Sequence, residues 1–248
     1  MKWVRRLIIR RLKSVGRDVV YRYLDGPHIP WTYIWWQNHW WRWLLSLLGP
    51  SEVFGLIYAE NLWGVEESRS GAGSTLSETE VMRNTLPTLL SQLKVKTLLD
   101  LPCGDFHWMS RITLSGIDYT GADIVPALIA RNASQYSGLN RVFVELDLVT
   151  SQLPMVDAVL CRDCLVHLPN EMVTTALQNL CSSGSTWFIS TTFPSQLENP
   201  DITLGLWRPI NLERPPFSLP PPQTLLHEGN PDPRYSDKCL GVWRISEL

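Results

Sequence analysis

Apolar and polar positions repeat with two different periods along residues 78–193, which predicts strands and helices in alternation. Short apolar runs, typical of buried strands, occupy residues 96–101, 119–124, 141–148, 155–161 and 186–193. Stretches with the three- to four-residue spacing of helices lie among them, at 107–114, 126–136 and 170–181. Elements that alternate in this way form a mainly parallel sheet covered by helices on both faces. The pattern therefore predicts an α/β fold.

Turn and cap signals before this region predict a flexible loop followed by a helix. Residues 60–76 are rich in glycine, serine and threonine, which is typical of a loop. The sequence Ser77-x-x-Glu80 has the form of a capping box and predicts a helix from there to about Leu93.

The chain after the last of these strands has a different composition. Ten of the eighteen prolines fall between Pro194 and Pro233, so this stretch is not expected to form central strands, although brief edge segments remain open. Strand character returns at Leu240 to Ile245, which we expect at an edge of the sheet.

The first fifty residues form a basic, tryptophan-rich arm. They carry nine Lys or Arg against two Asp, while the formal net charge of the whole chain is -2, and they hold seven of the twelve tryptophans. Residues 3–23 show one apolar helical stripe, and residues 31–48 are apolar nearly all round but too polar and short for a membrane span. A helical anchor on a membrane surface and two helices packed over the core both remain open. The acidic remainder argues against nucleic-acid binding.

Length and cysteine content suggest how the chain is organised. With 248 residues one sizeable core is expected, and we divide the chain into an arm (1–50), a loop or lid region (51–77) and a core domain (78–248). The five cysteines lack the spacing of a disulfide framework, and no signal peptide is evident, so a cytoplasmic protein is expected, with membrane association through residues 1–48 left open. The Cys161-x-x-Cys164 pair has no second pair for zinc, which favours incidental cysteines.

Acidic residues end four successive predicted strands. They are Asp100, Asp123, Asp147 and Asp163. In an open parallel sheet the ligand lies beyond the carboxyl ends of the strands, so these residues are candidates for a binding site. Asp123 follows Asp100 by 23 residues, the distance at which an acidic side chain meets ribose hydroxyls in nucleoside-binding α/β units.

The turn after the first strand reads Asp100-Leu-Pro-Cys-Gly-Asp-Phe106. Gly104 would allow a ligand to approach the backbone closely, and a helix start beyond it would offer amides to an anion. Together with Asp123, Asp147 and residues 162–168, this turn resembles that of the class I, Rossmann-like S-adenosylmethionine (SAM)-dependent methyltransferases over residues 78–193. Residues 100–109 are similar to a branch of uncharacterised methyltransferase-like proteins with this Asp-Leu-Pro-Cys-Gly-Asp-Phe turn.

The resemblance implies a set of cofactor contacts. The turn residues would surround the methionine part of SAM; they are Asp100, Pro102, Cys103, Gly104 and Asp105. Asp123 with Ile124 would hold the ribose, Asp147 with Leu148 would flank the adenine, and Arg162 with Asp163 would line the pocket near the methyl group.

The turn departs from the three-glycine pattern of the superfamily. Pro102 and Phe106 replace the outer glycines, and only Gly104 is retained. Because the G-x-G-x-x-G pattern is incomplete, a nicotinamide-dependent oxidoreductase is disfavoured.

Methyl transfer to a hydroxyl needs positioning and a general base, for which Asp163 and His167 are the candidates. No metal is expected. Residues 68–75 are a candidate cover, and Trp63, Arg69, the segment 207–209 and Phe217 could line the acceptor side. The favoured hypothesis is a methyltransferase that acts on a small-molecule or glycan acceptor through O-methylation. The alternative is a catalytically silent, membrane-associated scaffold, and the oligomeric state is open.

Overall fold

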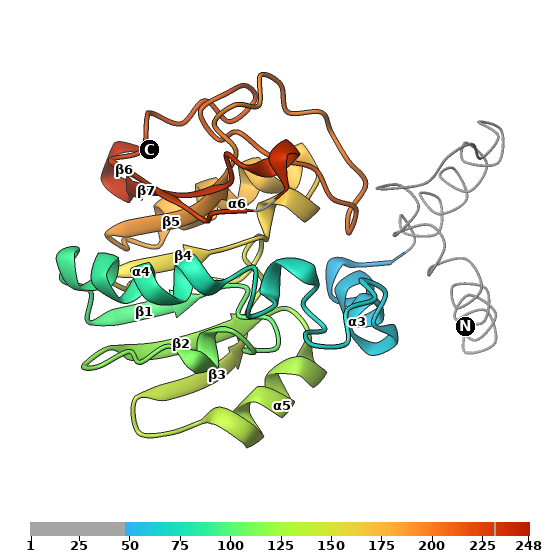
Figure 1. Cartoon of the computed structure of the whole chain (residues 1–248), viewed down its shortest axis with the longest axis vertical. Helices are drawn as coiled ribbons and strands as arrows, with labels where there is room; N and C mark the ends of the chain where they lie inside the picture. Colours follow the sequence, from blue (N-terminus) through green and yellow to red (C-terminus); the bar gives the residue numbers. More distant parts are fainter. Residues whose placement is uncertain (1–47, 231) are drawn as a thin grey trace, which may run out of the picture.

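The chain folds around a seven-stranded sheet in a computed structural model that describes residues 48–230 and 232–248 (Figure 1). The strand order is β3-β2-β1-β4-β5-β7-β6. Strands β1 to β5 are parallel, and β7 runs antiparallel to both of its neighbours. The strands are β1 (Thr97–Asp100), β2 (Asp118–Asp123), β3 (Arg141–Glu145), β4 (Ala158–Cys161), β5 (Trp187–Thr192), β6 (Thr224–His227) and β7 (Cys239–Arg244).

Four α-helices and five short 3-10 turns accompany the sheet in the described part of the chain. The α-helices are α3 (Pro50–Glu60), α4 (Glu80–Gln92), α5 (Pro126–Tyr136) and α6 (Asn170–Ser182), and the 3-10 turns are η1 (Ala72–Ser74), η2 (Met109–Arg111), η3 (Leu165–His167), η4 (Pro233–Tyr235) and η5 (Ile245–Glu247). Helix α3 lies at the end of the sheet where the parallel strands terminate (Figure 1). No helix among the described residues is long and apolar enough to cross a membrane.

Two buried clusters lie on opposite faces of the sheet. Neighbouring residues of a strand point to opposite faces, and Leu98 accordingly packs in the cluster under α4 and α5, whereas Leu99 packs in the cluster under α6. The first cluster includes Phe106, Tyr119 and Phe143, and the second includes residues of the proline-rich segment. The central strands β1, β4 and β5 are thus buried on both sides, as the continuous apolar runs predict.

Most predicted elements are confirmed. Helix α5 has the predicted bounds, with proline in its first turn. Strands β1, β2, β4 and β5 lie within the predicted runs or begin one residue before them, while β3 ends at Glu145 rather than at Leu148. The predicted α/β sheet covered on both faces is confirmed. The arm helices predicted within residues 1–47 lie outside the described residues.

The predicted helix at 107–114 is wrong, because only the single 3-10 turn η2 forms there. Phe106 adopts a left-handed φ of 59°. Its ring packs against Tyr119, Tyr136 and Phe143, with centroids 5.1 to 5.3 Å apart. Trp108, Met109 and Ile112 are buried after this turn without forming the apolar stripe of a helix.

The predicted capping box is also wrong. Helix α4 begins at Glu80 after Thr79, which makes no side-chain cap. Instead Thr75 organises the preceding turns, because its hydroxyl accepts from the Glu78 amide (3.4 Å) and bonds the Ser77 hydroxyl (3.2 Å).

Two further features differ from the predictions. Strand β7, expected at an edge, lies between β5 and β6 because the chain forms an additional edge strand, β6, within the proline-rich region. Residues 51–77, expected as a loop or lid, begin with helix α3 up to Glu60. The helix has proline in its first turn and buries Val53 and Ile57.

Candidate functional site

The carboxyl ends of β1, β2 and β4 meet at one edge of the sheet. Strand β1 pairs with both of the others, and Asp100 lies beside Gly121 and Leu160. The residues that follow, Asp123 on β2 and Arg162 after β4, are therefore brought next to Asp100. All three side chains are buried.

Asp100 lies at the centre of this edge. Its Oδ2 accepts a hydrogen bond of 2.5 Å from the Tyr119 hydroxyl. Burial raises the pKa of Asp100 to about 7, and the negative charge of Asp123 acts in the same direction, while the Tyr119 hydrogen bond opposes the change.

Asp123 is held by the backbone. Its Oδ1 accepts from the Val125 amide at 3.0 Å. Burial raises the pKa of Asp123 to about 6, and hydrogen bonds from the Val125, Gly104 and Ile124 amides limit that rise. Two carboxyl groups whose pKa values approach neutrality thus lie at adjacent strand ends, an arrangement typical of functional sites.

The turn between them depends on Gly104. This residue has a φ of 53°, and its carbonyl accepts from the side-chain Nδ2 of Asn132 at 2.8 Å. The Cys103 amide binds the Ala122 carbonyl at 2.7 Å, and the Leu101–Pro102 peptide is cis. A Cβ at Gly104 would lie 2.4 Å from the Ser70 hydroxyl, so both the conformation and the close approach require glycine.

Residues 67–75, called the strap below, cross the site from the β1 turn toward the end of β4. The Ser68 hydroxyl and the Arg69 amide donate to the Asp105 carboxylate at 2.9 to 3.1 Å. The Ser70 hydroxyl accepts from the Asp105 amide at 2.8 Å. The side chain of Asp105, one of the expected cofactor contacts, is thus engaged by the strap.

The other end of the strap reaches Asp163. A Cβ placed on Gly73 would lie 2.7 Å from the Asp163 Oδ2, so the strap backbone lies directly against this carboxylate. The strap therefore covers the strand ends, as expected of a lid; whether it moves stays a prediction.

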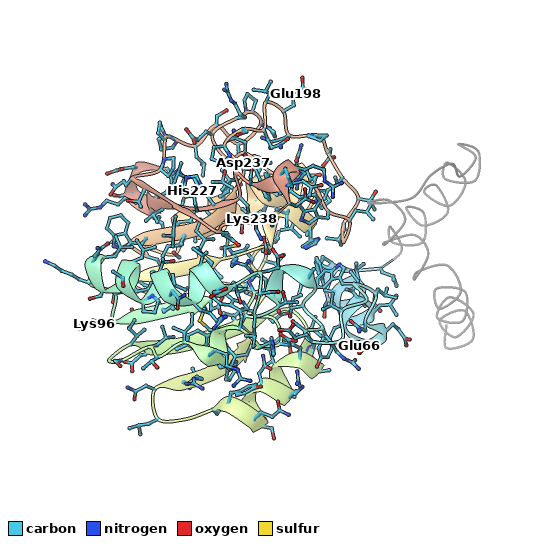
Figure 2. All side chains as sticks on the ribbon, viewed as in Figure 1. Glu66, Lys96, Glu198, His227, Asp237 and Lys238 are labelled. Atoms are coloured by element: carbon cyan, nitrogen blue, oxygen red, sulfur yellow. The ribbon has the colours of Figure 1, made fainter. Side chains whose placement is uncertain are left out.

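A cluster of four charges lies at the end of β4, defined here as the buried Arg162, Glu228 and Lys238 and the partly buried Asp163. The Arg162 guanidinium bonds Glu228 at 2.5 Å and Asp163 at 3.1 Å. The Lys238 ammonium lies 2.7 Å from Asp163 and 3.2 Å from Glu228. Figure 2 shows Lys238 inside the molecule, in contrast to Lys96 at its periphery.

The cluster determines the protonation of Asp163. Burial alone would raise the pKa of Asp163, but the adjacent Arg162 and Lys238 outweigh burial and hold it well below its usual range. The Thr191 hydroxyl also binds Asp163, both at its amide (2.8 Å) and at its carboxylate (3.3 Å). Asp163 is consequently a weak base.

His167 lies on η3, beyond the end of β4. Its Nδ1 donates to the Leu206 carbonyl at 2.9 Å, so Nε2 is the acceptor in the neutral ring. Trp63 stacks on the imidazole, with ring centroids 5.0 Å apart and an angle of 29°. Burial lowers the pKa of His167, although the Leu206 carbonyl and Asp163 oppose this. The imidazole is therefore neutral at pH 7.

The remaining predicted cofactor residues lie around the same edge but have local partners. Asp147 accepts from the Val149 amide (2.9 Å) and the Thr150 hydroxyl (2.7 Å) of its own turn. Leu148 is buried in the cluster under α6. The Ile124 carbonyl accepts from the hydroxyl of Ser51 on α3. Their roles toward a cofactor stay predictions.

Two residues suggested for the acceptor side belong elsewhere. The Arg69 guanidinium points back to α3, where it bonds the Tyr58 and Ala59 carbonyls. The Arg208 guanidinium is buried and binds the Leu165 and Leu168 carbonyls at 3.0 Å. Both guanidinium groups therefore hold backbone in place and are occupied.

Sequence reasoning missed several members of the site. Tyr119 begins a predicted strand, and nothing in the sequence of that strand indicates the hydrogen bond from its hydroxyl to Asp100. Glu228 and Lys238 flank the β6–β7 connection without any motif. Their only signal is the presence of charged residues beside apolar strand residues.

No protein-family model matches the chain, and no curated protein matches it significantly. Solved structures do match. Human N-acetylserotonin methyltransferase, in complex with SAM, has a TM-score of 0.54 at 13% identity over 80% of this chain, which spans 60% of that protein's length. The 1,6-didemethyltoxoflavin-N1-methyltransferase of Burkholderia thailandensis, with bound 1,6-didemethyltoxoflavin and S-adenosylhomocysteine, has a TM-score of 0.54 at 17% identity, covering 89% of this chain and 92% of that one. The chain therefore shares the Rossmann-like α/β fold of these two structures.

Proposed function

We propose that the protein is a SAM-dependent methyltransferase. The observation that carries this proposal is the pair of buried carboxyl groups, Asp100 and Asp123, around the left-handed Gly104 turn at adjacent strand ends. Structural neighbours with the same fold were crystallised with SAM or S-adenosylhomocysteine, which supports the same cofactor here.

The residues present fit this cofactor. Asp123 is a buried carboxylate whose partners in the described part of the chain are backbone amides, which suits it to accept from the two ribose hydroxyls. The turn from Asp100 to Asp105 would surround the methionine part, and Asp147 with Leu148 would flank the adenine. When bound, SAM supplies a methyl group on a positively charged sulfur.

We propose that the acceptor is a hydroxyl of a small molecule or glycan. His167 would take the hydroxyl proton at Nε2, because its Nδ1 is committed to Leu206 and its ring is neutral at pH 7. Asp163, the other candidate base, would serve to orient Lys238 and Arg162 near the methyl group. Trp63 would exclude water from the imidazole by covering one of its faces.

We expect the imidazole of His167 to titrate below pH 6.5 in the folded protein. Burial under Trp63 disfavours the charged ring, so Trp63→Ala should move the pKa of His167 upward. NMR titration of the histidine ring protons measures both values, with His167→Gln identifying the resonance. A pKa of 6.5 or higher with Trp63 in place would contradict the role of neutral base.

Calorimetric titration of the full-length protein with SAM, S-adenosylhomocysteine and NAD tests the proposed function. We expect micromolar binding of the two sulfur compounds and none of NAD. A folded protein that binds neither sulfur compound would overturn the proposal.

The same titration distinguishes the proposed enzyme from the alternative, a catalytically silent methyltransferase-like scaffold. One observation favours that alternative: the strap already lies against Gly104 and Asp163. If the strap closes the site permanently, SAM will not bind even though the fold is intact.

A further inference from the structure

Strand β3 leaves backbone hydrogen-bonding groups unused at an edge of the sheet. On the side that faces β2, the Asn140 carbonyl accepts from the backbone amide of Tyr119, and the Leu146 amide donates to the backbone carbonyl of Asp123. Because alternate residues of a strand face the same neighbour, the amides and carbonyls of Phe143 and Glu145 point away from β2. Within the described residues, nothing pairs with them.

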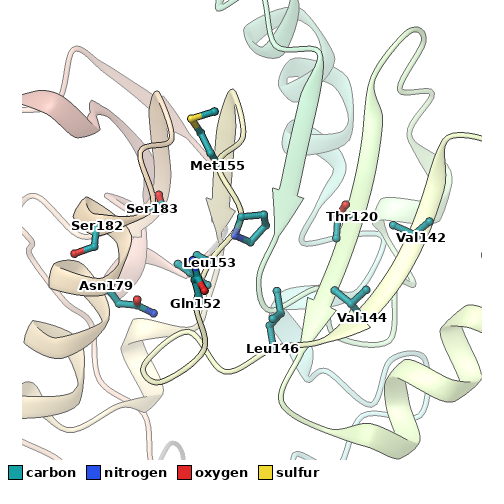
Figure 3. Close-up of a pocket in the computed structure, with 11 residues that line it drawn as sticks. Thr120, Val142, Val144, Leu146, Gln152, Leu153, Met155, Asn179, Ser182 and Ser183 are labelled. Carbon is teal, nitrogen blue, oxygen red and sulfur yellow. The ribbon is translucent and has the colours of Figure 1, made fainter.

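The side chains beside this edge form an apolar groove. Val142 and Val144 are 49% and 37% exposed and lie on the face opposite Phe143. With Leu146 they line one wall of a groove of about 670 Å³, and Met155, 76% exposed, lies on the other wall (Figure 3). The groove exists because residues 146–157, which connect β3 to β4, contain no helix to cover the sheet.

The opposite edge of the sheet is protected differently. Strand β6 has prolines on both sides, at 220–222 and at 231 and 233, and prolines block the addition of a further strand. Strand β3 has no proline, lysine or bulge to serve this purpose. An exposed strand edge with an apolar face is a template for pairing with another strand.

We propose that a second copy of this chain pairs antiparallel with β3, with Val144 of both copies on the two-fold axis. In this register Phe143 lies opposite the partner's Glu145, and Glu145 lies opposite the partner's Phe143. Each of these two pairs exchanges two backbone hydrogen bonds, which gives four across the interface. Val142 lies opposite the partner's Leu146, so the valines and leucines of both copies form one apolar strip along the groove.

The unused groups and the charges select this register. A two-fold axis at Phe143 would need the Arg141 amide and carbonyl, which already bond Gly138 at 3.2 and 3.0 Å. An axis at Glu145 would need the Asp147 amide, which donates to the Ser151 hydroxyl. With the axis at Val144, Arg141 lies opposite the partner's Asp147, which places opposite charges together at both ends.

Cysteine substitutions in the full-length chain test both the dimer and its register. In a Cys181→Ser background, which removes the exposed native thiol, Val144→Cys places two thiols at a non-hydrogen-bonded pair, where Cα atoms about 4.5 Å apart suit a disulfide. Val142→Cys is the matched control on the same strand and face. The two cysteines at position 142 of such a dimer would lie about 14 Å apart, offset by four residues along the strand direction, which is too far for a disulfide.

We expect the parent protein to sediment as a dimer at tens of micromolar. Oxidised glutathione should convert Val144→Cys, and not Val142→Cys, to a covalent dimer on a non-reducing gel. Val144→Lys, which sets two like charges opposite each other at an exposed position, should weaken the dimer at least tenfold without changing the circular dichroism spectrum. A monomeric parent protein would overturn the proposal and would leave residues 1–47 or another protein as the occupant of the groove. Equal crosslinking of the two cysteine variants would also overturn it.

Discussion

Replacing Asp123 by alanine is expected to lower the affinity for SAM about 100-fold or more. Hydrogen bonds to a charged group contribute about 1.5 to 3 kcal/mol each. In the proposed binding mode the buried Asp123 carboxylate accepts from both ribose hydroxyls, and the alanine variant would lose both bonds. Calorimetric titration measures the change. Asp118→Ala is the matched control, because Asp118 lies on the same strand but is exposed at its opposite end.

The pH dependence of binding checks the same assignment. Because burial raises the pKa of Asp123 to about 6, the carboxylate is ionised above pH 6 and becomes protonated as the pH falls through that value. Affinity for SAM should therefore hold from pH 8 to 7 and decline below pH 6. Asp123→Asn should bind weakly at every pH. A wild-type profile as flat as that of Asp123→Asn would remove Asp123 from the site.

Much of the fold could be predicted because its signals are local. Helix α5 begins with proline and carries apolar residues at helical spacing, so its bounds follow from the sequence alone. The central strands are buried on both faces and read as short apolar runs. The carboxyl ends of parallel neighbours meet by geometry, which is why Asp100 and Asp123 could be paired in advance.

The rest of the site depends on contacts between distant segments. Ser68 meets Asp105 across 37 positions, and Arg162 meets Glu228 across 66. No periodicity encodes such pairs, because their distance in space is determined by packing. The failure of the predicted helix after Phe106 has the same origin, since its ring packs with residues of β2, α5 and β3.

Replacing Glu228 by alanine is expected to destabilise the protein by about 3 to 5 kcal/mol. Breaking a buried ion pair on one side leaves the other charge uncompensated, and here two cations, Arg162 and Lys238, would keep Asp163 as their one shared ion-pair partner. Urea unfolding monitored by circular dichroism gives the free energy of unfolding. Asp232→Asn serves as the control, because it weakens an exposed ion pair with Arg234 in the same region and should leave the midpoint unchanged.

A second variant separates charge from shape at this position. Glu228→Gln keeps nearly the same volume and can still accept a hydrogen bond from Arg162, so it leaves no cavity. If the uncompensated cations cause the loss, Glu228→Gln will be destabilised nearly as much as Glu228→Ala. If the glutamine variant matches the wild type, packing and not charge holds the β6–β7 connection against β4.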